Sequence, residues 1–342
     1  MKYGSVRFRL LANWSWLYAA PPAVVRDVFV RALFSAAVMA ALAPELSAET
    51  LDAQTLGAKT LGANPSEHRA QVLDALPGAL VPRDAQNRLM ALVASTIRPS
   101  APAMHWKGKC SAPKDTVLFK SALPNLARVL GKGGPVRIIA LGSSSTAGSG
   151  ASSPLASYPA RLDAELDRRF PTNDIHVDNQ GAGGQLARDM LERIHSYIAA
   201  LPEAPALVIW QTGVNDATQD VGLAEFSAYL ERGILDLRSA GIDVILVDMQ
   251  YYPRSERVAV YGDYLRTMHK VAEQHKVPVF QRFAIMKYLV KSGQHSAEQL
   301  LAPDNFHLND LSYGCLADLM ADAIEEQIKA GRLMASQLPT SR

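Results

Sequence analysis

A serine, a histidine and an aspartate in this sequence have the side chains needed for nucleophilic attack on an acyl group. Ser144 lies in a segment rich in glycine and hydroxyl groups, and Asp304 lies shortly before His307. A serine hydroxyl is a weak nucleophile until a base takes its proton, and a carboxylate can hold that base in the right tautomer. We therefore predict that Ser144 is the nucleophile, His307 the general base, and Asp304 the acceptor for the Nδ1 proton of His307.

The same chemistry needs hydrogen-bond donors for the oxygen that becomes negatively charged during attack. We predict three: the backbone N–H of Ser144, the backbone N–H of Gly181 and the side-chain amide of Asn215. A glycine lets a carbonyl group approach the backbone closely, and an asparagine offers a neutral N–H donor. Taken alone, Asn215 and Asp216 are also typical of a turn or helix cap.

Ser144, Gly181 and Asn215 follow strand-like segments that alternate with helical ones, and Asp304 and His307 come before the last helical one. Apolar, β-favouring runs are predicted as strands at 136–141, 175–179, 207–210, 244–248 and 277–280. Helices are predicted at 159–170, 185–200, 224–239, 261–275 and 311–330, with an additional amphipathic stretch at 88–97. This alternation predicts an α/β fold whose five parallel strands carry helices on both faces. The loops that leave the carboxyl ends of parallel strands converge at one edge, so the predicted catalytic residues should meet there.

Four short blocks of the sequence resemble those of the SGNH hydrolases, also called the GDSL esterase/lipase family. The blocks, in order, are Gly142-Ser143-Ser144-Ser145-Thr146-Ala147-Gly148, then Gly181, then Gly213-Val214-Asn215-Asp216, then Asp304-Asn305-Phe306-His307. The resemblance spans residues 135–328. It implies a flavodoxin-like three-layer α/β/α fold and ester hydrolysis through Ser144, Gly181, Asn215 and His307, with Asp304 completing the triad.

One position departs from that family pattern. The family usually has an aspartate before the nucleophile, whereas this chain has Ser143. The aspartate supports the nucleophile and does not replace it, so the triad itself is unaffected. We expect a neighbour, Ser145 or Thr146, to provide the missing support.

The resulting hypothesis is a serine esterase acting on a small-molecule, lipid or glycan ester. The alternatives are an acyl or acetyl transferase acting on glycan hydroxyls, which would use the same residues, and a catalytically silent periplasmic glycan-binding domain. Labelling of Ser144 by a fluorophosphonate would separate an enzyme from a binding domain. Gln250 and Tyr251 follow a predicted strand at the same edge, so they either line the pocket or belong to a plain loop.

No cofactor or metal is predicted. The loop at 142–150 lacks the Gly-Lys-Ser/Thr ending of a phosphate-binding loop and the glycine spacing of a dinucleotide fingerprint. The other histidines lack metal-ligand spacing. The formal net charge is +2 over 342 residues without a basic run, which argues against a nucleic-acid partner, and 48% hydrophobic residues suffice for one sizeable core. The oligomeric state is left open.

The first 48 residues have the pattern of a secretory signal peptide, with arginines before an apolar run at 33–43 that is too short to span a bilayer. An N-terminal apolar helix is the alternative, and a start codon assigned too far upstream would explain the length before that run. Residues 49–109 are expected to be a partly disordered linker, residues 110–332 the hydrolase domain and 333–342 a tail. The mature chain would be periplasmic or secreted, with no stable membrane span. An exported chain with two cysteines favours a Cys110–Cys315 disulfide over two unrelated thiols.

Overall fold

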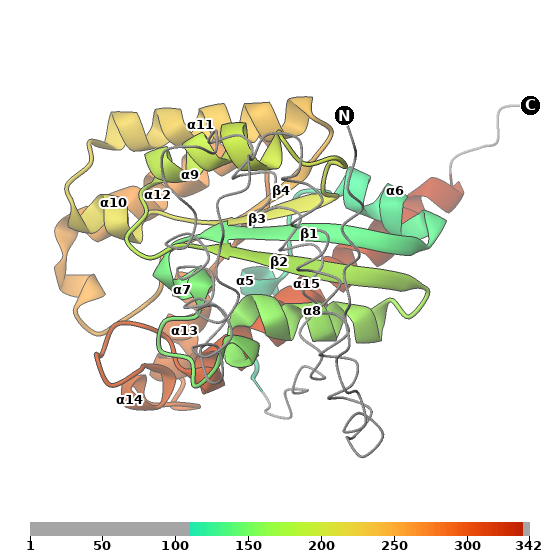
Figure 1. Ribbon diagram of the computed structural model, residues 1–342. Coiled ribbons are helices and arrows are strands. Elements are labelled where there is room, and N and C mark those ends of the chain that lie inside the picture. Colours follow the sequence, from blue (N-terminus) through green and yellow to red (C-terminus); the bar gives the residue numbers. More distant parts are fainter. Residues whose placement is uncertain (1–109, 338–342) are drawn as a thin grey trace, which may run out of the picture. The chain divides into compact units, whose positions relative to one another are not determined.

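Five parallel strands form one sheet in the order β2-β1-β3-β4-β5 in the computed structural model, which describes residues 110–337 (Figure 1). The strands are β1 (Gly134–Gly142), β2 (Asn173–Gly181), β3 (Leu207–Gln211), β4 (Asp243–Val247) and β5 (Val279–Phe280). The predictions for residues 1–109, including the signal peptide, the linker and the stretch at 88–97, lie outside the described residues.

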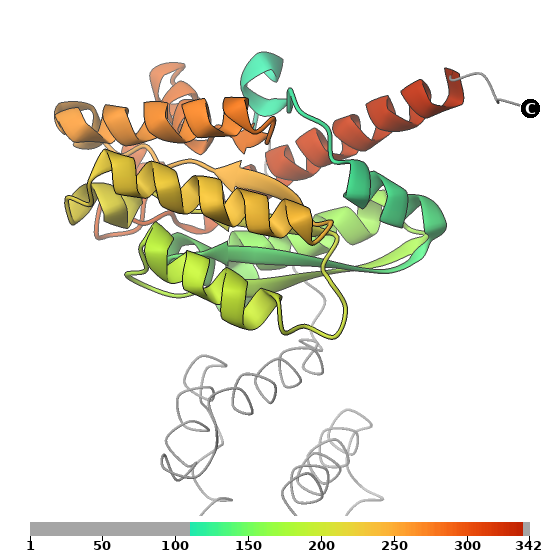
Figure 2. The same cartoon turned by 90° about the horizontal axis from the view of Figure 1, so that it is seen from above.

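Helices cover both faces of the sheet, which confirms the predicted three-layer α/β/α fold. They are α5 (Lys114–Val117), α6 (Pro124–Lys132), α7 (Ser144–Ala147), α8 (Tyr158–Arg169), α9 (Ala187–Arg193), α10 (Val214–Thr218), α11 (Leu223–Ser239), α12 (Ala259–Gln274), α13 (Arg282–Lys291), α14 (Ala297–Leu300) and α15 (Asp310–Gln337). Helices α9, α11 and α12 pack on one face, where α11 and α12 run side by side (Figure 2), and α8 and α15 pack together on the other.

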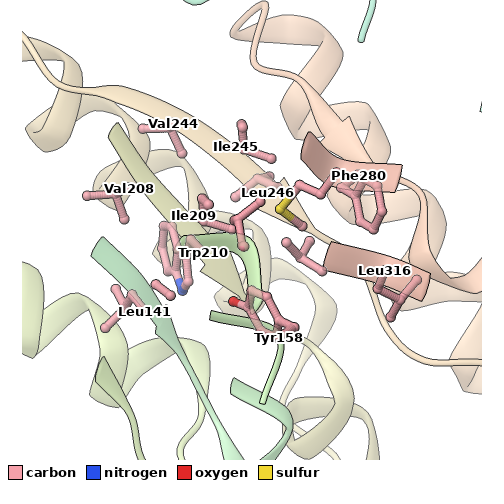
Figure 3. Close-up of a cluster of buried hydrophobic side chains, with 14 of the residues drawn as sticks. Leu141, Tyr158, Val208, Ile209, Trp210, Val244, Ile245, Leu246, Phe280 and Leu316 are labelled. Carbon is pink, nitrogen blue, oxygen red and sulfur yellow. The ribbon is translucent and has the colours of Figure 1, made fainter. Parts of the chain in front are cut away.

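The core lies around the two central strands, β1 and β3. Residues of β1 from Ile138 onward are buried on both sides, as expected for a central parallel strand. Trp210 of β3 is fully buried, pairs in register with Leu141 and donates its indole N–H to the sulfur of Met190 at 3.1 Å (Figure 3). Gly233 lies against the indole ring, where a Cβ would come within 2.5 Å of a ring atom, so α11 can pack this closely on the sheet only with glycine there.

The strand order fixes where a binding crevice can form. The chain crosses from β1 to β2 on one side and returns to place β3 on the other side of β1. In open α/β sheets the crevice lies beyond the carboxyl ends of the strands at such a reversal. Ser144 directly follows β1 and Asn215 follows β3, so both lie beside this point.

Several elements differ from the predicted ones. Strand β5 has two residues, shorter than the predicted 277–280, because it pairs only with Leu246 and Val247 and is preceded by Pro278, which has no N–H to donate. Helix α15 runs to Gln337 and enters the segment predicted as a tail. Helices α5, α6, α7, α10, α13 and α14 were not predicted.

A disulfide joins the first described residue to the start of α15, as expected from the sequence. Cys110 and Cys315 have Cα atoms 5.4 Å apart and are separated by 205 positions in the chain. Cys315 is fully buried near the start of α15. The bond therefore ties the first described residue to the helix that follows His307.

Among residues 110–337, no helix combines the length and the apolar character needed to cross a membrane.

Candidate active site

Ser144 is the first residue of α7, directly after the end of β1. Ser143 before it is extended, with φ −93° and ψ −150°, and the short helix ends at Gly148, with φ 96°. Gly142 permits this sharp turn, because a Cβ there would lie 2.1 Å from Oγ1 of Thr146. The first N–H groups of a helix have no partner within it, and the N–H of Ser144 donates to none of the described residues.

The side chains of Ser144, His307 and Asp304 form one hydrogen-bonded chain. Nε2 of His307 lies 2.9 Å from Oγ of Ser144, and Nδ1 of His307 lies 2.6 Å from Oδ2 of Asp304. With the Nδ1 proton directed to the carboxylate, Nε2 is left as an acceptor for the serine proton. The structure thus brings together the three residues predicted to form the triad.

Asp304 also orients the backbone of its own loop. Its Oδ1 accepts the backbone N–H of Phe306 at 3.0 Å and that of His307 at 2.9 Å. Partial burial raises the pKa of Asp304, but the hydrogen bonds from the His307 ring and from these two N–H groups outweigh it, and the net pKa lies below the usual value. The carboxylate therefore stays ionised at neutral pH and can hold a positively charged imidazole.

The two ends of the loop that carries Asp304 and His307 are joined by hydrogen bonds, and the loop packs against the segment that follows Ser144. Ala302 donates its N–H to the carbonyl of His307 at 2.8 Å, and Leu301 pairs with Leu308 in an antiparallel bridge. Gly150, with φ 86°, faces this loop, and a Cβ there would lie 2.3 Å from the carbonyl oxygen of Leu308 and 3.2 Å from Cβ of His307. The close approach of the two loops keeps His307 within reach of Ser144.

Asn215 lies in the first turn of α10 with its side chain directed at the loop after β2. Its Nδ2 donates to the backbone oxygen of Gln185 at 2.8 Å, which leaves a second proton on the same nitrogen. Asp216 is fully buried and accepts the N–H of Ala187 at 3.0 Å, which anchors the same loop at the start of α9. Burial raises the pKa of Asp216, although this hydrogen bond opposes the shift.

Gly181 does not fit the role predicted for it. Its N–H donates to Oδ1 of Asn179 at 2.9 Å, and its Cα packs against the backbone of α7, where a Cβ would lie 2.0 Å from the nitrogen of Ala147. The glycine is needed for this contact and its N–H is occupied. Gly184, three residues on, is exposed with φ 76°, precedes the Gln185 carbonyl that binds Asn215, and its N–H donates to no described residue.

Gln250 and Tyr251, expected either to line the pocket or to belong to a plain loop, are both buried. Oε1 of Gln250 accepts from the buried Arg282 at 3.1 Å, and the hydroxyl of Tyr251 lies 3.3 Å from Glu256. The sequence left open whether these residues line a pocket or belong to a plain loop, because burial cannot be read from a stretch of consecutive polar and aromatic residues.

An aromatic pair that the sequence did not single out lies beside the base. The ring of Phe306 meets the His307 ring edge to face at 5.0 Å between centroids, and meets Tyr252 in the same way at 5.2 Å. Phe306 is half-buried, so part of its ring is open to solvent next to the triad. The position of Phe306 between Asp304 and His307 in the sequence could have indicated that it lies near the site.

One group of described residues brings three metal-type ligand atoms within 4.8 Å of one another: Cys110, His295 and Cys315. Both sulfurs belong to the disulfide, and the metal ligand is the thiolate.

The described part of the chain matches a known protein family. Residues 109–330 match the model of a family described as non-GDSL lipase-like. A comparison with curated proteins finds no match.

Among solved structures, two crystal structures of a two-domain esterase active on acetylated mannans are similar to this chain, one of them co-crystallised with mannopentaose. The identities are 21% and 20%, with a TM-score of 0.53 in both cases. The matches cover 62% and 64% of this chain but 56% and 58% of the esterase, so the chain spans little more than half of that protein's length. A lipase/acylhydrolase from Enterococcus faecalis is 22% identical over 56% of this chain and 96% of its own, with a TM-score of 0.46. The first two similarities establish a common fold.

Proposed function

Because this chain belongs to the non-GDSL lipase-like family, an ester hydrolase family of the SGNH type, we propose that it hydrolyses carboxylic esters with Ser144 as its nucleophile. The observation that carries the proposal is the chain of hydrogen bonds from Ser144 through His307 to Asp304, at 2.9 Å and 2.6 Å. Both distances are within the range expected of a nucleophile, its base and the group that orients the base.

The reaction proceeds in two halves. Oγ of Ser144 attacks the ester carbonyl while Nε2 of His307 takes its proton, and the resulting imidazolium is held by the ionised Asp304. His307 then gives the proton to the departing alcohol, which leaves an acyl group on Ser144. Water, deprotonated by His307, attacks this acyl group and releases the acid, which restores Ser144.

The negative oxygen of each tetrahedral intermediate is held by N–H donors around Ser144. We assign the N–H of Ser144 and the second proton on Nδ2 of Asn215 to this role, as expected from the sequence. The third donor is assigned to the N–H of Gly184 in place of Gly181, whose N–H is already bound to Asn179. Gly184 is adjacent to the Gln185 carbonyl that Asn215 contacts, so these two donors belong to one hydrogen-bonded unit.

For the substrate we propose an acetylated carbohydrate. The two-domain esterase with the same fold is active on acetylated mannans. In this chain the half-exposed ring of Phe306 lies next to His307 and is backed by Tyr252, so an apolar aromatic surface is available for a sugar ring beside the reacting ester. An extracellular or periplasmic site of action agrees with such a substrate and with the Cys110–Cys315 disulfide.

The test is a hydrolysis panel with the wild-type chain and Ser144→Ala. The panel runs from acetyl to long-chain esters and includes acetylated oligosaccharides and lysophospholipids. We expect acetylated oligosaccharides to be turned over fastest and Ser144→Ala to lose turnover and fluorophosphonate labelling while it remains folded. Full activity in Ser144→Ala would exclude the mechanism, and a preference for long acyl chains would exclude the substrate. Acetyl transfer to added glycan in preference to water would identify a transferase.

A further inference from the structure

A single buried oxygen collects the hydrogen bonds of the turn that carries Ser144. Gln211 is the last residue of β3 and is fully buried. Its Oε1 accepts the backbone N–H of Ser143 at 3.2 Å, the hydroxyl of Ser143 at 3.2 Å and the hydroxyl of Thr146 at 3.0 Å. These donors lie one residue before Ser144 and two residues after it, so both sides of the nucleophile are attached to one carboxamide.

The donors fix which way the Gln211 carboxamide faces. A backbone N–H can only donate, so the oxygen and not the nitrogen of Gln211 must point at Ser143. This leaves Nε2 of Gln211 buried and without a hydrogen-bond partner among the described residues. A buried donor without a partner is costly, so an arrangement that retains one calls for an explanation beyond packing.

A second buried side chain orients the Thr146 hydroxyl toward Gln211. The hydroxyl of Tyr158 lies 3.4 Å from Oγ1 of Thr146. Burial raises the pKa of Tyr158 to about 12, so Tyr158 keeps its proton and can donate it to Thr146. The proton of Thr146 is then free for Gln211. Figure 3 shows Tyr158 in the same buried cluster as Trp210, the residue before Gln211.

We infer that Gln211 is a positioning residue for the nucleophile: its neutral carboxamide oxygen holds Ser143 and Thr146 so that Oγ of Ser144 stays in reach of His307. The inference rests on the proposed function. It also explains how Ser143 can stand where the resembling family has an aspartate. Aspartate at 143 would bring a carboxylate against Oε1 of Gln211, two acceptors facing each other, whereas serine supplies a donor.

The side chains of Gln211 and Ser143 carry no charge, and this matters for the proposed reaction. A negative charge beside the nucleophile turn would stabilise the protonated form of His307 and would oppose the negative charge that develops on the substrate oxygen. Gln211 and Ser143 are both uncharged, and the carboxylate that contacts His307 is Asp304, on the side of the imidazole opposite Ser144.

Two substitutions separate positioning from packing. Gln211→Met keeps a long, unbranched side chain and removes the acceptor; we expect kcat to fall by about 10- to 100-fold, as for a small misplacement of reacting groups, with KM changed by less than about 3-fold. Gln211→Glu keeps an acceptor and adds a charge once ionised. We expect it to lower kcat and to move the acid limb of the kcat/KM profile to higher pH, which a purely structural role would not do.

The matched control is Gln250→Met, which removes a buried glutamine acceptor that binds Arg282 and not the nucleophile turn. It should lower the melting temperature and leave kcat within about 3-fold of the wild type. Circular dichroism checks that each variant is folded. Amide hydrogen exchange at Ser143 reports its bond to Gln211 without any substrate, and we expect faster exchange in Gln211→Met.

The outcomes separate the two proposals. Wild-type kcat in Gln211→Met with an unmoved acid limb in Gln211→Glu would overturn the role of Gln211 while Ser144-dependent hydrolysis stands. Equal hydrolysis by the wild type and Ser144→Ala would overturn the proposed function instead. In that case amide hydrogen exchange still tests the role of Gln211. An unchanged exchange rate at Ser143 in Gln211→Met would show that Gln211 does not restrain the turn, and a faster rate would support the inference.

Discussion

At the scale of single residues, one side chain of the candidate site can serve both the fold and the proposed reaction. Asn215 illustrates this, because one proton of its amide binds the Gln185 carbonyl and the other is available to a substrate. The amide thus shapes the loop after β2 and, in the proposed mechanism, offers a donor to the reaction. Removing the amide should therefore weaken the transition state, in which the substrate oxygen carries negative charge, more than the bound substrate.

We expect Asn215→Ala to lower kcat by about 10²- to 10³-fold, roughly 2.7 to 4 kcal/mol of transition-state stabilisation, as for other oxyanion donors. Steady-state kinetics on an acetyl ester measure this, with KM expected to change little. Thr218→Ala is the control in the same helix, since its hydroxyl contacts only the backbone of Asn215. A variant that loses affinity alone would place Asn215 in the binding pocket.

The sequence pointed to three residues whose side chains the structure brings together. Ser144, Asp304 and His307 could be chosen because their side chains suit a nucleophile, its base and the group that orients the base, and because they stand in the order of the blocks in the family that the chain resembles. The choice between Gly181 and Gly184 could not be made, because any glycine offers an N–H and only the structure shows that one of them is occupied. Gln211 carries no reactive group, so its role becomes visible only from its three donors.

At the scale of elements, we expect the contact between the loop after Ser144 (the nucleophile loop) and the loop that carries Asp304 and His307 (the base loop) to control the distance from Ser144 to His307. Gly150 is the point of contact, with positive φ and no room for a Cβ beside Leu308. The alternation of strands and helices predicted both loops at one edge of the sheet. Their direct contact could not be predicted, because it depends on the conformation of two irregular segments.

Gly150→Ala should push the base loop away from the nucleophile and lower kcat by about 10²-fold, the cost of a misplacement near 1 Å. Gly241→Ala is the matched control: Gly241 also has positive φ, at 73°, but no atom lies within 4 Å of its would-be Cβ. Both variants should be destabilised by the strained backbone, and only Gly150→Ala should lose activity. Similar kcat values for the two would show that the loop contact is not needed.

A second contact between elements ties α8 to β2 and is sensitive to pH. Nδ1 of His176 lies 3.3 Å from Asp163 of α8, and its Nε2 lies 2.8 Å from Asp178, which also meets Arg137 at 3.4 Å. Hydrogen bonds to Asp163 and Asp178 raise the pKa of His176 from 6.5 to about 9, against the opposing effect of burial. The protonated histidine is therefore the form that joins the two elements.

Since the folded pKa of His176 is the higher one, its contribution to stability is fully present below pH 6.5 and is lost as the pH rises through about 9. The contribution is at most on the order of 3 kcal/mol. Urea unfolding of the wild type and His176→Gln should differ most near pH 6 and converge near pH 10. His275→Gln, outside this cluster, is the control. A difference that does not vary with pH would mean that packing, and not charge, stabilises the contact.

At the scale of the whole molecule, the sequence predicted the architecture because strand and helix periods repeat over the domain. The differences have a physical reason: β5 is shorter than predicted because it is an edge strand with few partners, and the short helices α5 and α14 have too few residues to show a period. The disulfide could be proposed from the cysteine count, but the sequence could not show that two residues separated by 205 positions meet in the fold.

Replacing Cys110 and Cys315 together by serine should lower the free energy of unfolding, by at most about 5 kcal/mol on the chain-entropy model. Unfolding with and without reductant measures this, and the double variant should behave like the reduced wild type. Alkylation of the unfolded, unreduced wild type should label neither cysteine. Labelling of both would show that the bond is absent, and the case for an exported protein would lose a support.

The Cys110–Cys315 bond also makes the domain a covalent ring that contains every strand and the complete triad. A protease that cuts once inside this ring opens it without producing two separate fragments. Nicked protein should therefore run as a single species on a gel without reductant and as two with it. For the same reason, new chain ends can be introduced at any tolerant loop of the ring, with the sulfur bridge serving as the link between the pieces.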